Sequence, residues 1–404
     1  MGGGIVGSFI ALNLSEDYEV HWILGGPTRS AAAWGSGGLI QPGSGSLFQK
    51  YQGISQLLKW ILSERSVVRM SPSFLWRERR WLSVYAEQGR SSNTTTTEAT
   101  ALWRAMASDS LKEIESSVQT QMECDSSKEL LQCYRDPKAL RANRYALLKS
   151  VPSVRFREVG SKECRELEPE LTQDVVGGFL FEDDLWINPA ELLDKMRSRL
   201  AKSTTIHDER VGSVATEAGK VAELALGSES LKTDDYVFAT GASLPELLKD
   251  IGLEIPIVPA WGHMITLRPN RRVLQRTVQI GESRMVIAQT RDSLIRASAS
   301  VELAPRNHSF PPRRYRALKK MASGAVPMLV SSDITDTWSG MRPVTPDGLP
   351  IIGRSSKYEN LLIAGGHGRL GVTLAPATGR MVKQMLSSER IEGAQFLSPA
   401  RFGL

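Results

Sequence analysis

Glycines near both ends of this 404-residue chain carry its clearest chemical pattern. Gly2, Gly4 and Gly7 have the spacing G-x-G-x-x-G. In that spacing the glycines allow a tight turn, let the backbone approach a pyrophosphate, and let the following helix pack closely with its N-terminus toward the phosphates. The turn alone is a weak pattern, so its meaning depends on the elements around it.

The residues that follow fit half of a nucleotide-binding β-α-β unit. Apolar residues recur at helical spacing over 5–14, and 18–24 (YEVHWIL) predicts a buried strand. In such units an acidic residue ends the second strand and binds the adenosine ribose. Here the strand ends at Leu24 and two glycines follow. Either backbone and water hold the ribose, or Arg29 makes a different contact.

The C-terminal part holds a second and more specific group of turns. The stretch 338–353 (WSGMRPVTPDGLPIIG) is followed by 360–379 (NLLIAGGHGRLGVTLAPATG). Together they place two glycine-rich turns, Arg342, Arg369 and the start of a predicted helix in one part of the chain. An earlier stretch, 234–243 (DDYVFATGAS), predicts a strand that ends in small residues, where either a nucleotide or a plain buried turn would fit.

Other segments predict the elements that position these turns. The glycine-, serine- and alanine-rich stretch 25–46 suits backbone that lies against a ligand. The apolar, tryptophan-rich and basic stretch 54–87 predicts two helices broken near Pro72. The polar stretch 91–100 predicts an exposed bridge into a helix over 97–122. Further predicted elements are a helix with Pro189 in its first turn, a hairpin over 221–231, and antiparallel strands over 257–267 and 277–297.

Composition limits the class of protein. The length suits two packed domains, and 41% hydrophobic with 23% charged residues is ordinary for a soluble globular chain. We expect no membrane span, no secretory leader and a cytoplasmic location. The three cysteines match no metal-site spacing, so we expect reduced thiols and no bound metal. The net charge of +6 is spread along the chain without a nucleic-acid-binding motif, so we expect no nucleic acid partner.

With these motifs in view, the chain resembles the D-amino-acid oxidase superfamily of FAD-dependent enzymes. Within it, the chain is most similar to the branch of the D-amino-acid dehydrogenase small subunit and glycine oxidase. The stretches that carry the resemblance are the turn at 2–7, the small residues at 30–41, QLLKWIL (56–62), LEPEL (167–171), GGFLFEDD (177–184), ATGA (239–242) and the two C-terminal motifs.

The resemblance implies an α/β fold, α+β overall, with a Rossmann-like FAD-binding domain and an inserted antiparallel-sheet substrate domain. The implied FAD-binding domain is discontinuous and comprises 1–50, 140–245 and 331–404. The implied substrate-binding domain comprises 51–139 and 246–330. In that family an apolar strand precedes the first glycines, so we expect either a start placed too late or a shortened sequence. The alternative is a protein that lacks this strand.

The implied activity is oxidative deamination of a D-amino acid. A hydride passes from Cα to flavin N5 of noncovalently bound FAD, and the imine is hydrolysed to a keto acid and ammonia. The electron acceptor would be a quinone of the respiratory chain or O2. Two alternatives stay open: an O2-using oxidase of glycine, sarcosine or proline-type amines, and a non-catalytic subunit with a flavoprotein fold. An oligomer is also left open.

The resemblance also assigns site residues. Arg342 matches the arginine that pairs bidentately with the substrate carboxylate, with a surface ion pair as the alternative. Arg369 matches a second arginine on the carboxylate or flavin side. His367 is either a flavin contact or a structural hydrogen-bonding residue. His263 and Trp261 would line the pocket or pack in the core. The predicted cofactor-binding residues are Gly2, Gly4, Gly7, Arg29, Ser30, Ala31, Gly38, Val211, Thr240, Gly241, Gly366, His367, Gly368, Leu370, Gly371, Val372 and Thr373.

The basic stretch 54–87 leaves two interpretations open. A dehydrogenase that passes electrons to a quinone would touch a membrane surface there, peripherally and on the inner face. Alternatively, a helical pair covers the active site with a solvated basic face.

Overall fold

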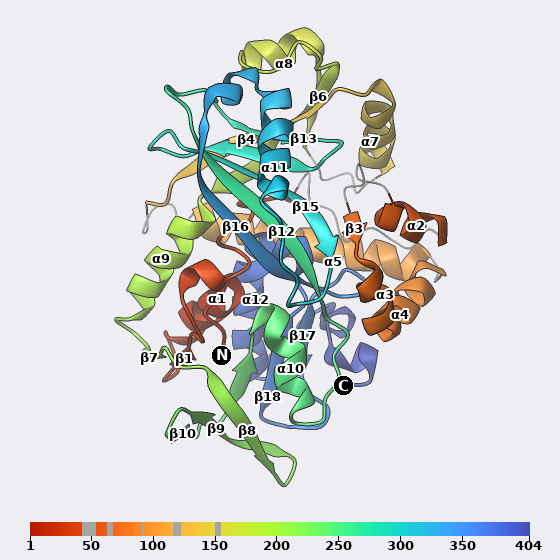
Figure 1. The fold of residues 1–404 in the computed structure, drawn as a ribbon. Helices are drawn as coiled ribbons and strands as arrows, with labels where there is room; N and C mark the ends of the chain where they lie inside the picture. The colour runs from red at the N-terminus through yellow and green to blue at the C-terminus, as the bar shows by residue number, and fades with distance from the viewer. Residues whose placement is uncertain (43–53, 63–67, 91–92, 116–122, 150–154) are drawn as a thin grey trace.

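The computed structural model describes residues 1–42, 54–62, 68–90, 93–115, 123–149 and 155–404. Figure 1 shows a large curved sheet in the upper half of the view, and short parallel strands with the helices α1 and α12 in the lower half. The two parts meet along the long strands β12 and β16, which run from one into the other.

The glycine turn at the start of the chain leads into α1 (Ile5–Leu14). This helix packs along α12 (Gly371–Leu386). Gly379 of α12 makes the contact close, because a Cβ there would lie 2.5 Å from the carbonyl oxygen of Phe9. The two predicted helices therefore form one pair, although more than 350 residues separate them in the sequence.

Short strands flank this helix pair. β1 (His21–Ile23) pairs in parallel with β7 (Thr205–His207). β18 (Leu361–Gly365) pairs in parallel with β11 (Tyr236–Phe238) and antiparallel with β17 (Ile351–Arg354). The strand predicted over 18–24 thus contains only three residues in regular pairing.

The first residues of the chain lie between β1 and β11. The Gly2 N–H donates to the Ile23 carbonyl at 2.8 Å, and the Ala239 N–H donates to the Met1 carbonyl at 2.9 Å. These bonds hold the glycine turn at the carboxyl ends of both strands, which is where ligands bind in open parallel sheets.

The large sheet has the strand order β16-β12-β15-β14-β13-β4-β6-β2, with β3 beside β15 and β5 beside β6. Its strands are β2 (Leu39–Ile40), β3 (Val68–Met70), β4 (Ser126–Tyr134), β5 (Arg157–Gly160), β6 (Gly177–Ile187), β12 (Val258–Arg268), β13 (Thr277–Ile280), β14 (Met285–Gln289), β15 (Ile295–Leu303) and β16 (Asp333–Val344). The antiparallel strands predicted after residue 257 are confirmed, but β13 also pairs in parallel with β4.

The helices between the two parts differ from the prediction in detail. The segment 54–90 contains α2 (Ile54–Leu62), β3, α3 (Pro72–Arg77) and α4 (Arg79–Arg90). Pro72 begins a helix and does not break one, because a proline at the first turn has no N–H to lose and Ser71 caps the N-terminus. The polar stretch 91–100 was predicted as a bridge into a helix that begins at 97; this is wrong at 93–96, because α5 (Asn93–Glu113) already begins at Asn93. The predicted end of that helix at 122 lies outside the described residues.

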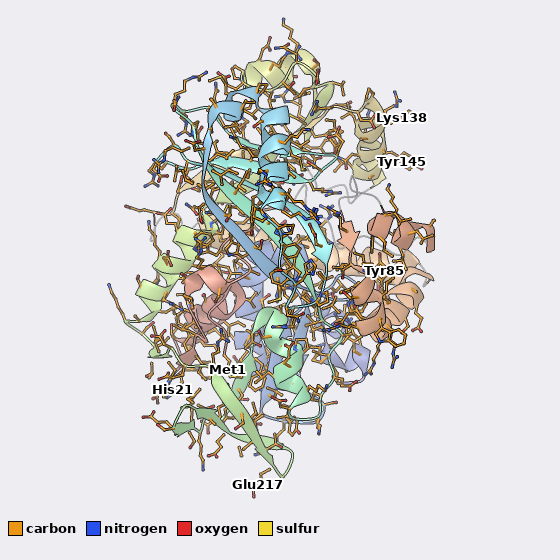
Figure 2. All side chains as sticks on the ribbon, viewed as in Figure 1. Met1, His21, Tyr85, Lys138, Tyr145 and Glu217 are labelled. Atoms are coloured by element: carbon orange, nitrogen blue, oxygen red, sulfur yellow. The ribbon has the colours of Figure 1, made fainter. Side chains whose placement is uncertain are left out.

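The remaining elements complete the two halves. The helix predicted at Pro189 is confirmed as α9 (Pro189–Leu200), with Asn188 as its N-cap. Glu217, labelled in Figure 2, stands at the tip of a hairpin that projects from the rest of the molecule. The other elements are α7 (Pro137–Lys149), α8 (Ser161–Leu167), β8 (Val211–Glu217), β9 (Lys220–Leu226), β10 (Glu229–Leu231), α10 (Leu244–Lys249) and α11 (Arg313–Ala325), with short 3-10 helices that include η1 (Thr28–Ser30), η3 (Gly241–Ser243), η4 (Pro327–Ser331) and η5 (Gly368–Leu370).

The two-domain division stays a prediction. Within it, β6 from 140–245 and β16 from 331–404 are hydrogen-bonded into the large sheet with strands from 51–139 and 246–330. β2 from 1–50 and β5 from 140–245 pair with β6 in the same sheet. A division by sheet would therefore move these four strands to the substrate-binding side.

Candidate active site

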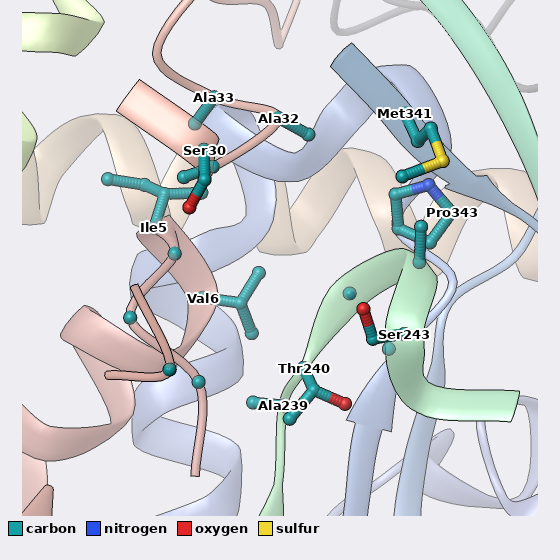
Figure 3. Close-up of a pocket in the computed structure, with 18 of the residues that line it drawn as sticks. Ile5, Val6, Ser30, Ala32, Ala33, Ala239, Thr240, Ser243, Met341 and Pro343 are labelled. Atoms are coloured by element: carbon teal, nitrogen blue, oxygen red, sulfur yellow. The ribbon is translucent and has the colours of Figure 1, made fainter. Parts of the chain in front are cut away.

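A crevice of about 620 Å³ opens between the glycine turn, β11 and the start of α12. Figure 3 shows Ile5 and Val6 on one side, Thr240 and Ser243 on another, and Met341 with Pro343 facing them. Of the predicted cofactor-binding residues, the lining includes Gly2, Gly4, Ser30, Ala31, Val211, Thr240, Gly241, His367, Gly368, Gly371 and Val372. Segments from the beginning, middle and end of the chain thus meet at one site.

The glycine turn needs its glycines for steric reasons that the structure makes explicit. Gly2 has φ +120°, which is unfavourable for other residues. A Cβ on Gly7 would collide with the Gly2 carbonyl oxygen, so Gly7 is what lets the turn fold back onto α1. Gly4 is the N-cap residue of α1, and no side chain caps the N-terminus of this helix. The N–H groups of the first turn of α1 and the helix dipole therefore face the crevice, where they suit a pyrophosphate.

Thr240 provides a second observation that fits a dinucleotide. Its Oγ1 is buried and has no hydrogen-bond partner among the described residues, although it belongs to the crevice lining. Buried hydroxyl groups are normally satisfied, so this one is placed to bond a bound ligand. The residues present therefore fit FAD: the uncapped N-terminus of α1 would hold the pyrophosphate, and the Thr240 turn would bond the cofactor.

The adenosine end differs from the usual pattern. Leu24 is followed by Gly25 and Gly26, with φ of +69° and +145°. Arg210 lies beside this turn, donates to the Gly25 carbonyl at 3.0 Å and lines the crevice. Arg29 does not line the crevice; it pairs with Asp336 at 2.6 Å. Of the two arginines, Arg210 is therefore the one that lines the crevice.

A smaller cavity of about 70 Å³ adjoins the crevice, and the two share Ser36, Arg342, Arg369 and Val372 as lining residues. Arg342 and Arg369 approach each other because Val344, at the end of β16, bridges to His367 through the backbone. The two predicted arginines thus stand where the crevice meets the small cavity. A third arginine, Arg284, lines only the small cavity.

Arg342 is held by the register of two strands. It stands opposite Ala260 in the pairing of β16 with β12, and its guanidinium lies over Gly262. A Cβ on Gly262 would overlap that guanidinium, so the glycine is what makes room for it. Burial lowers the pKa of Arg342 to about 10, which leaves it charged at neutral pH.

Arg369 lies in η5, just before α12. Burial, followed by repulsion from Arg284 and Arg342, lowers its pKa to about 9. Arg284 and Arg342 are thus close enough to Arg369 to disfavour its charge. An anion bound beside Arg369 would relieve that repulsion, so the arrangement suits an anionic ligand.

His367 is buried in the turn that begins this region. Its Nε2 is 2.9 Å from Thr378 Oγ1 on α12, and burial lowers its pKa to about 4. The ring is therefore neutral at physiological pH and ties the turn to α12. It lines the crevice as well, so both roles predicted for it are compatible with its position.

Other predicted residues lie around the site and not on the crevice surface. Gly38 lines the small cavity, and Thr373 donates to the Leu39 carbonyl at 3.0 Å. His263 bonds Ser339 at 2.6 Å and Trp261 donates to Pro305; neither is among the lining residues. The predicted residues that do not line the crevice are Gly7, Arg29, Gly38, Gly366, Leu370 and Thr373.

Sequence reasoning missed Arg284 and Gln279. Both come from the β13–β14 hairpin, which has no motif of its own. The pattern that would have found Arg284 is the turn GESR, a short hairpin connection that ends in a basic residue. Arg284 has φ +54°, an uncommon conformation for a residue with a Cβ.

The fold and this site define a flavin-dependent oxidoreductase. A family model described as FAD dependent oxidoreductase matches residues 1–385. The chain therefore belongs to the DAO family of FAD-dependent oxidoreductases, its cofactor is FAD, and an electron acceptor completes its reaction.

Relatives and solved structures agree with this assignment. The chain is 27% identical to a D-amino acid dehydrogenase of Vibrio vulnificus (strain CMCP6), over 100% of this chain and 98% of the relative. It is 26% identical to a D-amino acid dehydrogenase of Granulibacter bethesdensis, over 96% and 95%. Glycine oxidase from Geobacillus kaustophilus has the same fold, with a TM-score of 0.74 at 20% identity over 98% of this chain and 97% of that one. L-proline dehydrogenase from P. horikoshii also has it, with a TM-score of 0.72 at 20% identity over 99% and 96%.

Within the described part of the chain, no helix is long and apolar enough to cross a membrane. No three His, Cys, Asp or Glu residues of that part form a group that could hold a metal ion.

Proposed function

We propose that this enzyme oxidises a D-amino acid to the corresponding keto acid and ammonia. The observation that carries the proposal is the position of Arg342 and Arg369, which line both the crevice and the small cavity. A substrate carboxylate bound there would lie where the crevice meets the small cavity. The names of the relatives support the D configuration.

Each group of the chain has a defined task in this reaction. FAD, when bound, accepts the hydride that leaves Cα. Arg342 binds the substrate carboxylate bidentately and thereby fixes the direction in which Cα–H points. Gly262 leaves the space that this guanidinium occupies. The N-terminus of α12 at Gly371 and Val372 presents N–H groups to the crevice, where they would stabilise the negative charge that reduction adds.

The reaction is tested with purified holoenzyme and a panel of D- and L-amino acids. With a dye acceptor, we expect turnover of at least one D-amino acid and formation of one ammonia per two electrons passed to the dye. Oxygen consumption measured in parallel separates the dehydrogenase from the O2-using oxidase. The proposal fails if only glycine, sarcosine or L-proline is oxidised.

A surface feature favours a membrane-bound electron acceptor over O2. Leu58 and Leu62 on α2 and Trp76 on α3 are 50%, 76% and 77% exposed. The two helices pack in one cluster, so these side chains belong to one part of the surface. Exposed cations at Arg77 and Arg79 lie beside them. We propose that this part of α2 and α3 touches a membrane containing anionic lipids, and that the enzyme works peripherally on its inner face.

Vesicle binding tests this contact. The holoenzyme should sediment with vesicles of phosphatidylcholine and phosphatidylglycerol, and less with phosphatidylcholine alone, because the cations favour the anionic lipid. Leu62→Glu together with Trp76→Glu should abolish sedimentation while activity with a soluble dye stays unchanged. Tyr145→Glu on α7, another exposed aromatic residue, is the matched control. A wild-type protein that stays in the supernatant with both vesicle types contradicts the contact.

A further inference from the structure

Two glutamines lie side by side in the large sheet, next to the small cavity. Gln132 on β4 and Gln279 on β13 stand opposite each other in the parallel pairing of these strands. They are buried, with 3% and 1% of their surface exposed, and Gln279 lines the cavity. Because side chains alternate along a strand, their neighbours in sequence point to the other face, where they belong to one hydrophobic core; these are Leu131, Cys133, Val278 and Ile280. The two buried amides therefore need polar partners on the cavity face.

A chain of hydrogen bonds fixes the orientation of both amides. Gln132 Oε1 accepts from the Tyr134 hydroxyl and from Asn143 Nδ2, both at 3.0 Å. Burial raises the pKa of the Tyr134 phenol and Arg284 opposes this shift, so Arg284 lies near the phenol. A cation there favours the orientation in which the O–H points away from it, toward Gln132. The amide nitrogen of Gln132 then donates to Gln279 Oε1.

This chain of bonds ends at an unused donor. Gln279 Nε2 donates to no other described residue, because the hydrogen bond that Gln279 forms with Gln132 occupies its oxygen alone. The side chain is almost fully buried and lines the cavity, so the cavity is where an acceptor for this nitrogen would bind. A buried donor without an acceptor is costly, and the bonded chain behind Gln279 hinders its amide from turning over to avoid the cost.

The surroundings of this donor suit a short side chain with a hydroxyl group. Val286 on β14 pairs with Gln279 on one side and with Ser298 on the other, and all three residues line the cavity. Neighbouring strands are about 4.8 Å apart, so the amide and the serine hydroxyl flank one small space. No described residue is hydrogen-bonded to Ser298 Oγ, which is therefore available to accept. The volume of about 70 Å³ leaves room for a few non-hydrogen atoms, since a water molecule needs about 10–15 Å³.

We propose that Gln279 determines the substrate specificity of this enzyme: its amide nitrogen donates to the side-chain hydroxyl of a short hydroxy D-amino acid, and Ser298 accepts from that hydroxyl. Gln132 is a positioning residue, since it fixes the amide of Gln279 without contacting the substrate. The proposal rests on the proposed oxidation of a D-amino acid, with the α-carboxylate at Arg342.

Turnover of an isosteric substrate pair tests the role of Gln279. D-Serine and D-α-aminobutyrate differ only by a hydroxyl group in place of a methyl group. With a dye acceptor, kcat/KM for D-serine should be at least about tenfold higher, because a methyl group leaves the polar groups of the cavity unpaired. Gln279→Leu should bring this ratio to near one. Gln275→Leu, which changes an exposed glutamine outside both cavities, is the matched control and should keep the wild-type ratio.

Gln132→Glu tests the orientation of the amide. The substitution keeps the volume of the side chain, but a carboxylate only accepts hydrogen bonds. It would therefore accept from Gln279 Nε2 and turn Gln279 Oε1 toward the cavity, and the preference for D-serine should be lost as in Gln279→Leu. A Gln132→Glu enzyme that keeps the wild-type ratio would contradict the positioning role. If Gln279→Leu does not fold, this variant and the wild-type ratio decide the matter.

Binding without turnover separates this proposal from the proposed oxidation. Calorimetric titration of the holoenzyme compares β-hydroxypropionate with butyrate, which are the same two molecules without the amino group. We expect tighter binding of β-hydroxypropionate, and loss of the difference in Gln279→Leu. Equal binding of both, or equal use of D-serine and D-α-aminobutyrate, overturns the proposal and leaves the oxidation of D-amino acids intact. A chain that oxidises no amino acid but binds β-hydroxypropionate more tightly through Gln279 would refute the oxidation and retain the hydroxyl site.

Discussion

Two arginines and the glycines around them decide what this site can do. Arg342 and Arg369 were predicted from their motifs, and the structure places both on the lining of one crevice. Arg284 was not predicted, because its position depends on the β13–β14 hairpin, which is placed by the pairing of β14 with β15 and by no local pattern. Arg29 was predicted as a cofactor contact because it follows the predicted nucleotide-binding strand closely in the sequence. In the structure it instead forms an ion pair with Asp336, which is distant in the sequence.

Arg342→Ala should lower kcat/KM for an amino acid by about a hundredfold or more and leave FAD bound. Loss of a bidentate, charge-assisted contact in a water-poor site costs on the order of 3 kcal/mol. Lysine should restore little, because a point charge cannot reproduce the fork of the guanidinium. The decarboxylated amine is the control substrate. An equal loss on the amine, or a larger loss from Arg369→Ala, would assign the carboxylate contact elsewhere.

Gly262→Ala should weaken substrate binding although no side chain contacting the substrate changes. The new methyl group overlaps the Arg342 guanidinium, so that group must move. We expect a rise in KM of about tenfold or more with the flavin content unchanged. Gly160→Ala is the matched control, because a Cβ there meets nothing within 4 Å and its φ of −76° suits alanine. A variant whose KM equals that of the wild type would show that Arg342 does not depend on this glycine.

At the scale of elements, sequence patterns predicted the helices and strands whose ends depend on neighbouring residues, and missed those that depend on distant pairing. The start of α9 was predicted because Asn188 and Pro189 cap a helix in any context. β3 was missed, because its three residues form a strand only through pairing with β15, more than 200 residues away. The helix after the bridge was predicted to begin at 97, because the polar, low-complexity composition of 91–100 is typical of a linker, whereas the long helix α5 begins at Asn93 and packs on α12.

The turn between β18 and α12 should make stability depend on pH. His367 has a folded pKa of about 4 against an ordinary value of 6.5. Between these values the unfolded chain binds more protons than the folded one, so the free energy of unfolding falls as the pH falls from about 6.5 to about 4. The full contribution is on the order of 3 kcal/mol. His367→Gln should flatten this part of the profile in urea titrations at several pH values. Parallel profiles for the two proteins would contradict the buried neutral imidazole.

At the scale of the whole molecule, the crevice joins parts that are far apart in the sequence. Its lining comes from the glycine turn, from β11 and the residues after it, and from the β18–α12 turn. The resemblance predicted this assembly, since composition and periodicity alone do not determine which distant segments meet. The fold therefore has a ligand site where its separate segments meet, and ligand binding should stabilise all of them together.

Removal of FAD should lower the Tm of the whole chain, and addition of FAD should restore it. Binding at a thousand times Kd contributes about 4 kcal/mol to the folded state. FMN should restore less, because it lacks the adenosine half that the glycine turn and the region around Arg210 would contact. Differential scanning fluorimetry of the apoprotein with each flavin measures this. Equal stabilisation by FMN and FAD would place the adenosine outside the crevice.

The central claim is that a D-amino acid reduces the flavin of this enzyme directly. The measurement is the flavin absorbance at about 450 nm in anaerobic holoenzyme after rapid mixing with D-serine or L-serine at equal concentration. The account predicts complete bleaching by the D enantiomer, at least about tenfold faster than by the L enantiomer, and loss of that bleaching in Arg342→Ala. A flavin that stays oxidised with D-serine and with other D-amino acids alike would contradict it.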